Sequence, residues 1–225
     1  MQRATNLFNS QQRQEIEAAV TAAESQTSCE IVPVVATQSG RYDRAEDMVG
    51  LWLGVIAAIA VWLAFPRSAD DHGDWSGMTF DLGLLLMIIS IVVAFIIGAF
   101  AGSQVGWLRR LFTPRQQMEE EVNARARAIF FDQRVHHTSG ATGLLIYVSL
   151  YEQMAVVLGD QELLNKVGQP VLDQLCEQLT TTLKQSHPSE ALQTVITAAG
   201  QHLSAPLPRA ADDVNELADA LVLLD

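Results

Sequence analysis

The chain has 225 residues, with 14 basic and 26 acidic side chains and a formal net charge of −12. This length fits one ordinary domain plus a small additional element, since single hydrophobic cores usually span ~100 to 200 residues, and it argues against a two-domain soluble enzyme. The acidic balance and the presence of only two lysines argue against a nucleic-acid partner, because neutralising phosphates needs clustered lysines and arginines.

Residues 1–47 predict one helix followed by one strand. Asn9 or Ser10 can cap a helix that ends near Gln26, because apolar residues recur between these points at three- and four-residue spacing. Residues 29–37 are a β-branched apolar run, which is typical of a strand covered on both faces. Pro33 cannot donate a hydrogen bond to a neighbouring strand, so it predicts an edge strand or a bulge.

Two uncharged apolar segments follow, at residues 48–65 and 82–108. Each can cross a hydrocarbon core of ~30 Å as a helix that rises 1.5 Å per residue. Buried core helices of a soluble protein are the alternative interpretation, although such helices are usually shorter and keep a polar stripe. The sequence therefore predicts a transmembrane hairpin at residues 48–108, with its connecting loop at residues 66–81.

Glycines recur at every fourth position in both segments. Gly50 and Gly54 form one such pair, and Gly98, Gly102 and Gly106 form a series. Small residues on one face let helices approach closely, so these faces predict packing within the hairpin or, between chains, a homo-oligomer. The alternative is that glycine is simply frequent in membrane helices.

The distribution of arginines predicts the orientation of the hairpin. Arg41 and Arg44 precede the first span, and five arginines follow the second: Arg109, Arg110, Arg115, Arg125 and Arg127. The connecting loop has only Arg67 among several aspartates. The positive-inside rule then predicts a multi-pass protein of the cell (inner) membrane with both termini cytoplasmic. Neither span contains an ionisable side chain, which leaves a transport pathway no residue to use.

The segment 109–208 predicts further helices and a hairpin. Thr113 and Pro114 can begin a helix that ends near Gln133, and Pro170 and Pro188 can each open another. Between them, residues 143–150 and 154–158 are apolar runs separated by three residues, which indicates a β-hairpin. The tail at residues 209–225 is first acidic and then apolar, and it predicts a short helix or a strap docked on the domain.

Neither flank of the predicted membrane hairpin makes a domain alone, because one strand and a two-stranded ribbon are both marginal without partners. An even number of spans returns the chain to the side that it left. We therefore expect residues 1–47 and 109–208 to fold together as one α/β domain, a sandwich with a central sheet flanked by helices.

Several stretches of this soluble part carry a resemblance to a known family. They are residues 30–35, 143–152 and 213–217, together with Phe130, Thr138, Asp160 and Pro208. In their order and spacing the chain resembles the TPM domain family, and more narrowly its bacterial membrane-protein branch with two spans inside the domain. The resemblance implies an α/β sandwich, and it implies a range of roles, since family members have been linked to photosystem repair, receptor accessory functions, weak acid phosphatase activity and calcium binding.

Three carboxylates at predicted strand ends are the candidate site residues. Glu30 begins the first strand, Glu152 lies in the hairpin turn, and Asp160 follows the third strand. Carboxylates that converge at strand ends can bind a hard divalent cation, which prefers oxygen ligands. The competing interpretation is structural: Asp160 caps the next helix, Glu152 is a solvated turn residue and Glu30 is a strand-end charge.

Other motifs point away from catalysis. His136 and His137 are adjacent, so on an extended chain they point to opposite sides, and we expect them to be loop residues rather than metal ligands. The sequence contains no GxSxG, CxxC, P-loop or HExxH motif. No cofactor is expected beyond a divalent cation at the three carboxylates.

The leading hypothesis is a membrane-anchored, non-catalytic accessory, assembly or interaction factor, whose partners are the lipid bilayer and other membrane proteins. The alternative is a metal-dependent phosphatase-like hydrolase, in which Glu30, Glu152 or Asp160 hold a cation that activates water. A third idea is lipid sensing, with Arg109, Arg110 and Arg115 contacting anionic headgroups. The same arginines already set the orientation, so they provide no independent support for lipid sensing.

Overall fold

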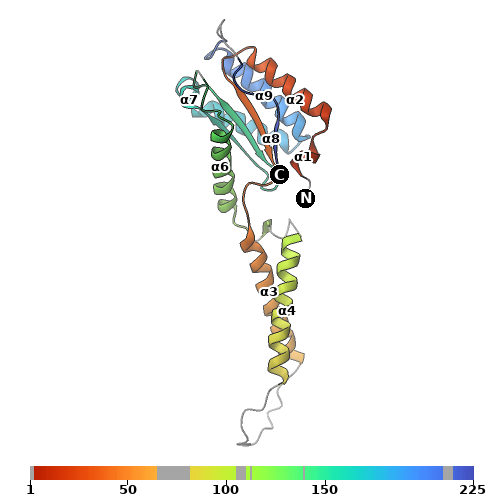
Figure 1. Ribbon diagram of the computed structural model, residues 1–225. Coiled ribbons are helices and arrows are strands. Elements are labelled where there is room, and N and C mark those ends of the chain that lie inside the picture. Colours follow the sequence, from red (N-terminus) through yellow and green to blue (C-terminus); the bar gives the residue numbers. More distant parts are fainter. Residues whose placement is uncertain (1–2, 65–81, 105–109, 112, 139, 210–214) are drawn as a thin grey trace, which may run out of the picture. The chain divides into compact units, whose positions relative to one another are not determined.

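The computed structural model describes residues 3–64, 82–104, 110–111, 113–138, 140–209 and 215–225, which divide into two compact units (Figure 1). One, here called the α/β unit, combines Met1–Gly40 with Gln116–Asp225. The other, here called the hairpin unit, is Arg41–Arg115. The predicted loop at 66–81, the end of the second predicted span with Gly106, and most of the acidic part of the tail lie outside the described residues.

The α/β unit contains a four-stranded sheet with the strand order β3-β2-β1-β4. Its strands are β1 (Ile31–Ala36), β2 (Leu144–Ser149), β3 (Met154–Gly159) and β4 (Val222–Leu224). β1 runs parallel to both β2 and β4, whereas β2 and β3 form an antiparallel hairpin. Parallel neighbours need a crossover connection, and the crossover from β1 to β2 contains the entire hairpin unit.

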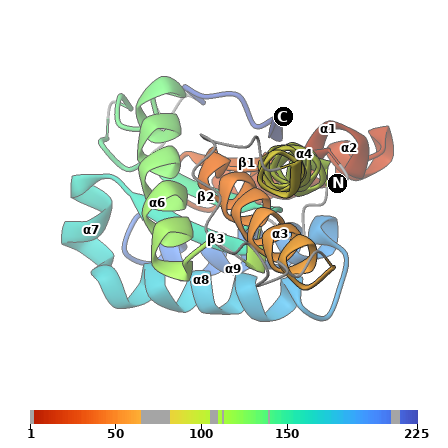
Figure 2. The same cartoon turned by 90° about the horizontal axis from the view of Figure 1, so that it is seen from below.

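Helices cover both faces of this sheet (Figure 2). Five helices build the core on one face: α1 (Ala4–Leu7), α2 (Ser10–Glu24), α7 (Gln161–Val167), α8 (Gln169–Leu183) and α9 (Pro188–Ser204). On the other face lies α6 (Arg115–Asp132). Along β1, Ile31 and Val35 join the first core, while Val32 and Val34 join the second. The unit is a mixed α/β fold with a helix-flanked sheet, as the sequence predicts.

The helices of this unit begin close to their predicted starts. At α2 the Asn9 side chain accepts a hydrogen bond from the Gln12 amide (2.8 Å), and the Gln12 side chain accepts one from the Asn9 amide (2.9 Å). This reciprocal capping box satisfies two backbone donors that the helix itself leaves unpaired. Prolines open α8 and α9 as predicted. In contrast, α6 begins one residue after Pro114.

The prediction that Pro33 marks an edge strand or a bulge is wrong, because β1 lies between two strands in continuous register. In a parallel ladder, alternate residues bond to opposite neighbours. Glu30 and Ala36 accept bonds from the β2 side, whereas the Thr37 amide donates to Leu224 of β4. Odd-numbered residues such as Pro33 thus face β4, which pairs only from Val34 onward. The missing N–H of Pro33 therefore has no strand partner to lose.

The tail is also different from its prediction as a helix or strap, because its last apolar residues form β4 at the edge of the sheet. The Asp225 side chain fixes this end, since it accepts hydrogen bonds from the hydroxyls of Thr5 (2.7 Å) and Thr37 (2.8 Å). These bonds to the carboxylate hold the pKa of Asp225 below its ordinary value. The C-terminus is thereby joined to both α1 and the end of β1.

The hairpin unit consists mainly of α3 (Asp43–Ala64) and α4 (Leu82–Gln104). Within them, Glu46–Ala64 and Gly83–Ser103 are long and apolar enough to cross a membrane. Their large apolar side chains point outward; Leu63 is 73% exposed and Phe100 68%. The first helix begins at Asp43, five residues before the predicted span at residue 48. The span was predicted from its lack of charged residues, whereas the helix also includes the charged residues that precede it.

The predicted glycine faces pack α3 against α4 within the chain. A Cβ atom added to Gly98 would lie 2.8 Å from the Gly50 Cα and 3.0 Å from the Val49 carbonyl oxygen. One added to Gly50 would lie 2.9 Å from the carbonyl oxygen of Phe95. Backbone atoms cannot move aside as a flexible side chain can, so the absence of a side chain is what permits this close approach.

Candidate functional site

Glu30 lies at the amino end of β1 and holds the returning C-terminal segment. Its side chain is 7% exposed. Its carboxylate oxygens accept hydrogen bonds from the backbone amides of Glu216 (3.3 Å) and Leu217 (3.4 Å). Glu30 therefore helps to position the segment that leads into β4, which is a structural role that its place at a strand end did not reveal.

Glu152 lies in the turn between β2 and β3, at the end of the sheet where β1 and β2 have their carboxyl ends. It is 1% exposed, so its prediction as a solvated turn residue is wrong. One carboxylate oxygen accepts hydrogen bonds from the amides of Ser39 (2.9 Å) and Gly40 (3.3 Å), and the other accepts one from the Ser149 hydroxyl. Glu152 thus anchors the chain where it leaves β1, immediately before the hairpin unit begins at Arg41.

Two buried side chains of β2 complete this network. The Ser39 hydroxyl donates to Ser149 (2.8 Å) and shares a hydrogen bond with the Tyr147 hydroxyl (2.9 Å). Burial raises the pKa of the Tyr147 phenol; the bond with Ser39 opposes this rise, and the charge of Glu152 adds to it. We call Ser39, Gly40, Tyr147, Ser149 and Glu152 the exit network. It lies at the carboxyl ends of parallel strands, where α/β proteins commonly bind ligands.

Asp160 caps α7, as the structural interpretation predicts. Its Oδ1 atom accepts a hydrogen bond from the Gln161 amide (2.7 Å). Its Oδ2 atom is buried and has no hydrogen-bond partner among the described residues.

The three predicted carboxylates do not come together. Glu30 and Glu152 lie at opposite ends of six-residue strands, which are about 20 Å long. Asp160 is at the same end of the sheet as Glu30, but β2 lies between β3, which precedes Asp160, and β1, which follows Glu30. Within the ranges that the structure describes, no three histidine, cysteine or acidic side chains are grouped as metal ligands. The arrangement of these carboxylates is thus that of three separate structural anchors.

His136 and His137 lie in the loop after α6, and both are exposed, as predicted. The ring of His136 packs against that of Phe131, with their centroids 4.8 Å apart. This contact gives His136 an aromatic neighbour.

Sequence reasoning missed a half-buried acidic group near the amino end of β1. Glu24, at the end of α2, accepts a hydrogen bond from the Ile31 amide (2.8 Å). Burial raises its pKa to about 8; the Ile31 bond and Arg209 oppose the rise, while the charges of Glu30 and Asp219 add to it. An acidic residue at a helix end looks solvent-exposed in sequence, so only its tertiary neighbours could have revealed it.

We expect Glu24 to make the protein less stable as the pH rises from about 4.5 to about 8. In the unfolded chain Glu24 releases its proton near the ordinary glutamate pKa of 4.5, whereas the folded chain keeps this proton until the pH reaches about 8, so folding is progressively disfavoured between those values. Glu24→Gln keeps an oxygen acceptor for Ile31 and removes the charge. It should raise the free energy of unfolding at pH 8.5 by about 1 to 2 kcal/mol, a value reduced for partial exposure to solvent.

The measurement is urea unfolding of both proteins across this pH range. Glu17→Gln, at an exposed position of the same helix, is the matched control and should leave the pH dependence unchanged. A Glu24→Gln profile parallel to that of the wild type would mean that Glu24 is ionised normally.

Comparisons with known proteins bear on the fold. No family model and no curated protein matches the chain. Among solved structures, it is similar to the BA42 protein of the psychrophilic bacterium Bizionia argentinensis, determined by NMR. The TM-score is 0.56 at 17% sequence identity, and the match covers 96% of this chain and 94% of the other. At this level of identity, the similarity establishes a shared fold and carries no functional assignment.

Proposed function

We propose that this protein is a membrane-anchored, TPM-like interaction module that acts as an accessory or assembly factor for other membrane proteins. The observation that carries the proposal is the outward apolar surface of α3 and α4, whose exposed side chains suit a lipid environment. A core helix of a soluble protein would bury such side chains, whereas only 17% and 6% of the two candidate spans are buried.

The position of the hairpin unit in the chain supports two spans rather than one. β1 precedes the hairpin unit and β2 follows it, yet the two strands pair in parallel. Such pairing requires both flanks to be in one compartment, and a hairpin with two spans meets this requirement. The arginine distribution favours the cytoplasm for that compartment, with both termini at the inner face of the cell membrane.

The chemistry of the α/β unit favours interaction over catalysis. Glu30 and Glu152 each accept backbone hydrogen bonds, and they lie at opposite ends of the strands. The alternative, a metal-dependent phosphatase-like hydrolase, would need these carboxylates to share a divalent cation. Their separation provides no support for that alternative.

In vivo photo-crosslinking tests the interaction role. The full-length protein would carry benzoylphenylalanine at exposed positions, such as Phe131 on α6 and, as a comparison, Gln174 on α8. We expect discrete and reproducible adducts with integral membrane proteins from at least one face of the α/β unit. Failure of every exposed position to form such adducts would contradict an accessory role.

Phosphatase turnover by the purified full-length protein tests the alternative. With Mg²⁺, Mn²⁺ or Zn²⁺ added, we expect the wild-type protein to hydrolyse the phosphatase substrate no faster than the Asp160→Asn variant does. Metal-dependent turnover that Asp160→Asn abolishes would instead favour the hydrolase.

A further inference from the structure

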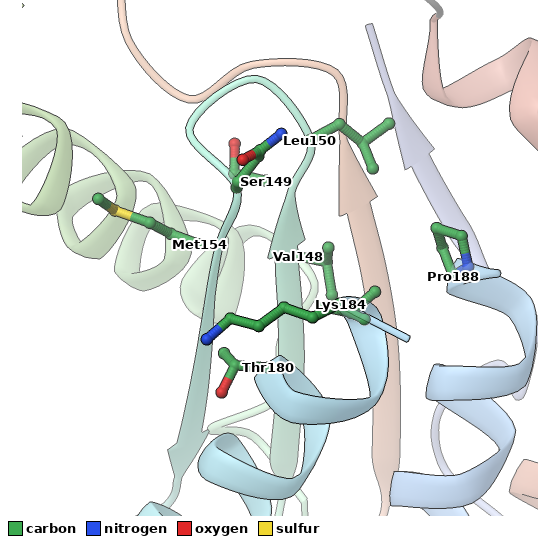
Figure 3. A pocket seen from close by; sticks show the side chains of 9 residues that line it. Val148, Ser149, Leu150, Met154, Thr180, Lys184 and Pro188 are labelled. Atoms are coloured by element: carbon green, nitrogen blue, oxygen red, sulfur yellow. The ribbon is translucent and has the colours of Figure 1, made fainter. Parts of the chain in front are cut away.

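A pocket of about 430 Å³ opens in the α/β unit beside the β2–β3 turn (Figure 3). Its walls come from the end of β2, the turn, the last turns of α8 and the start of α9. The lining includes apolar groups of Val148, Leu150, Leu183 and Pro188. Pockets that hold small molecules typically have this size and a largely apolar lining.

Among the described residues that line this pocket, Lys184 is the only charged one. Its side chain extends from α8 across the pocket toward β3 (Figure 3). It is one of two lysines in a chain of net charge −12. Within the part of the chain that the structure describes, its ammonium group has no ion pair or hydrogen bond. The pocket therefore has a local positive charge that the described part of the protein leaves uncompensated.

The other polar groups of the pocket offer little competition for a ligand's charge. The Thr180 hydroxyl donates back to carbonyl oxygens of its own helix, those of Cys176 and Glu177 (3.0 Å each), so it can only accept from a ligand. Ser149 belongs to the exit network and donates to Glu152. The uncharged side chain of Gln153 also lines the pocket, so the recognition chemistry is one cation and an amide beside largely apolar walls.

We propose that this pocket binds a small carboxylic acid with an apolar body, whose carboxylate pairs with Lys184 while the body lies against Val148, Leu150 and Leu183. A single ammonium matches a single negative charge. It would leave a phosphate dianion half-neutralised and would give an uncharged apolar molecule no orientation. The ligand class is therefore a monoanionic amphipathic molecule of about ten to fifteen heavy atoms, which such a volume can hold.

The rarity of lysine provides the reporter. Reductive methylation with ¹³C-formaldehyde converts Lys166 and Lys184 to dimethyl-lysines and keeps their charge. The labelled full-length protein would be placed in phosphatidylcholine nanodiscs and titrated with 4-phenylbutyrate, while proton–carbon spectra are recorded. Lys166, exposed in α7, is an internal control in the same sample. The probes for comparison are 4-phenylbutanol, which lacks the charge, and inorganic phosphate, which lacks the apolar body.

We expect the Lys184 signal to shift and saturate with a Kd of about 1 mM, a value consistent with one exposed ion pair and a small apolar contact. The Lys166 signal should not shift. Binding of 4-phenylbutanol should be about two- to fivefold weaker, and inorganic phosphate should not saturate at comparable concentrations.

Two variants of equal net charge complete the test. Thr180→Glu puts a carboxylate four residues before Lys184, where the two side chains pair on one helix face, so it should neutralise the cation without unfolding α8. It should abolish the saturable shift. Gln174→Glu, at an exposed position of α8 ten residues before Lys184, should retain it. Equal shifts of both lysines, equal binding of 4-phenylbutanol, or an undiminished shift in Thr180→Glu would each overturn the proposal.

Discussion

The Glu152→Ala variant should lose about 3 to 4 kcal/mol of unfolding free energy from the α/β unit. Glu152 is almost fully buried, and its carboxylate accepts bonds from the Ser39 and Gly40 amides and the Ser149 hydroxyl. Alanine would leave these donors buried without an acceptor, and each unsatisfied buried group costs about 1 to 3 kcal/mol. Glu152→Gln, which keeps one oxygen acceptor, should lose about half as much.

Pulsed thiol labelling of Cys29 in increasing urea, with Cys176 replaced by alanine in every variant, provides the measurement. Cys29 is buried in the core of the α/β unit, so it reacts only when that unit opens. All four tryptophans lie between residues 52 and 107, so their fluorescence would report on a different part of the chain. Glu177→Ala, at an exposed position of α8, is the control and should change the stability by less than about 0.5 kcal/mol. A Glu152→Ala protein as stable as this control would mean that the exit network contributes nothing.

The Gly98→Leu variant should force α3 and α4 apart by at least about 2 Å. The reason is steric: even a Cβ at this position would meet backbone atoms of Gly50 and Val49 at 2.8 and 3.0 Å. Helices that meet through ordinary side chains are about 8 to 10 Å apart, whereas glycine faces allow closer contact.

Spin labels at Ile59 on α3 and Ile88 on α4, both exposed positions, allow the distance distribution to be measured by pulsed electron resonance. We expect a longer and broader distribution in Gly98→Leu. Ala60→Leu makes a similar change at an exposed position of α3 and should leave the distribution unaltered. An unchanged distribution in Gly98→Leu would show that the glycine faces do not set the helix spacing, and a role for them between chains would then become the better interpretation.

Local periodicity predicted most elements of the fold correctly. The helices α2, α6, α8 and α9 each carry an apolar stripe of three- and four-residue spacing with a cap or proline at the start, and such signals lie within the element itself. The β2–β3 hairpin was similarly visible, because its two strands are adjacent in sequence.

Features that depend on distant partners were not predictable in the same way. β4 has three residues, too few for a recognisable alternation, and its partner β1 lies near the other end of the chain. The prediction for Pro33 was wrong for a related reason. A central strand can contain proline at this position only because β4 begins to pair with β1 after it, at Val34. A strand's position in its sheet is a tertiary property that local sequence does not contain.

For the candidate site, too, local features were predictable and contacts between distant segments were not. Strand ends correctly drew attention to Glu30, Glu152 and Asp160, but only the sheet order shows that they lie apart. Tyr147 and Ser149 are two residues apart and so share a face of β2, which is a readable signal for the exit network. Ser39 reaches the same place from a segment more than a hundred residues away. No spacing rule could have joined it to them.

Compartment mapping with a membrane-impermeant maleimide tests whether the chain before α3 and the chain after α4 lie on the same side of the membrane. With Cys29 and Cys176 replaced by alanine, single cysteines would be introduced at Gln11 in α2, at Ser76 between the two candidate spans, and at Gln201 in α9. We expect Ser76→Cys to react in intact cells, whereas Gln11→Cys and Gln201→Cys should react only after permeabilisation. Reaction of Gln11→Cys and Gln201→Cys from opposite sides would contradict this expectation, since β1 and β2 could then not share one sheet.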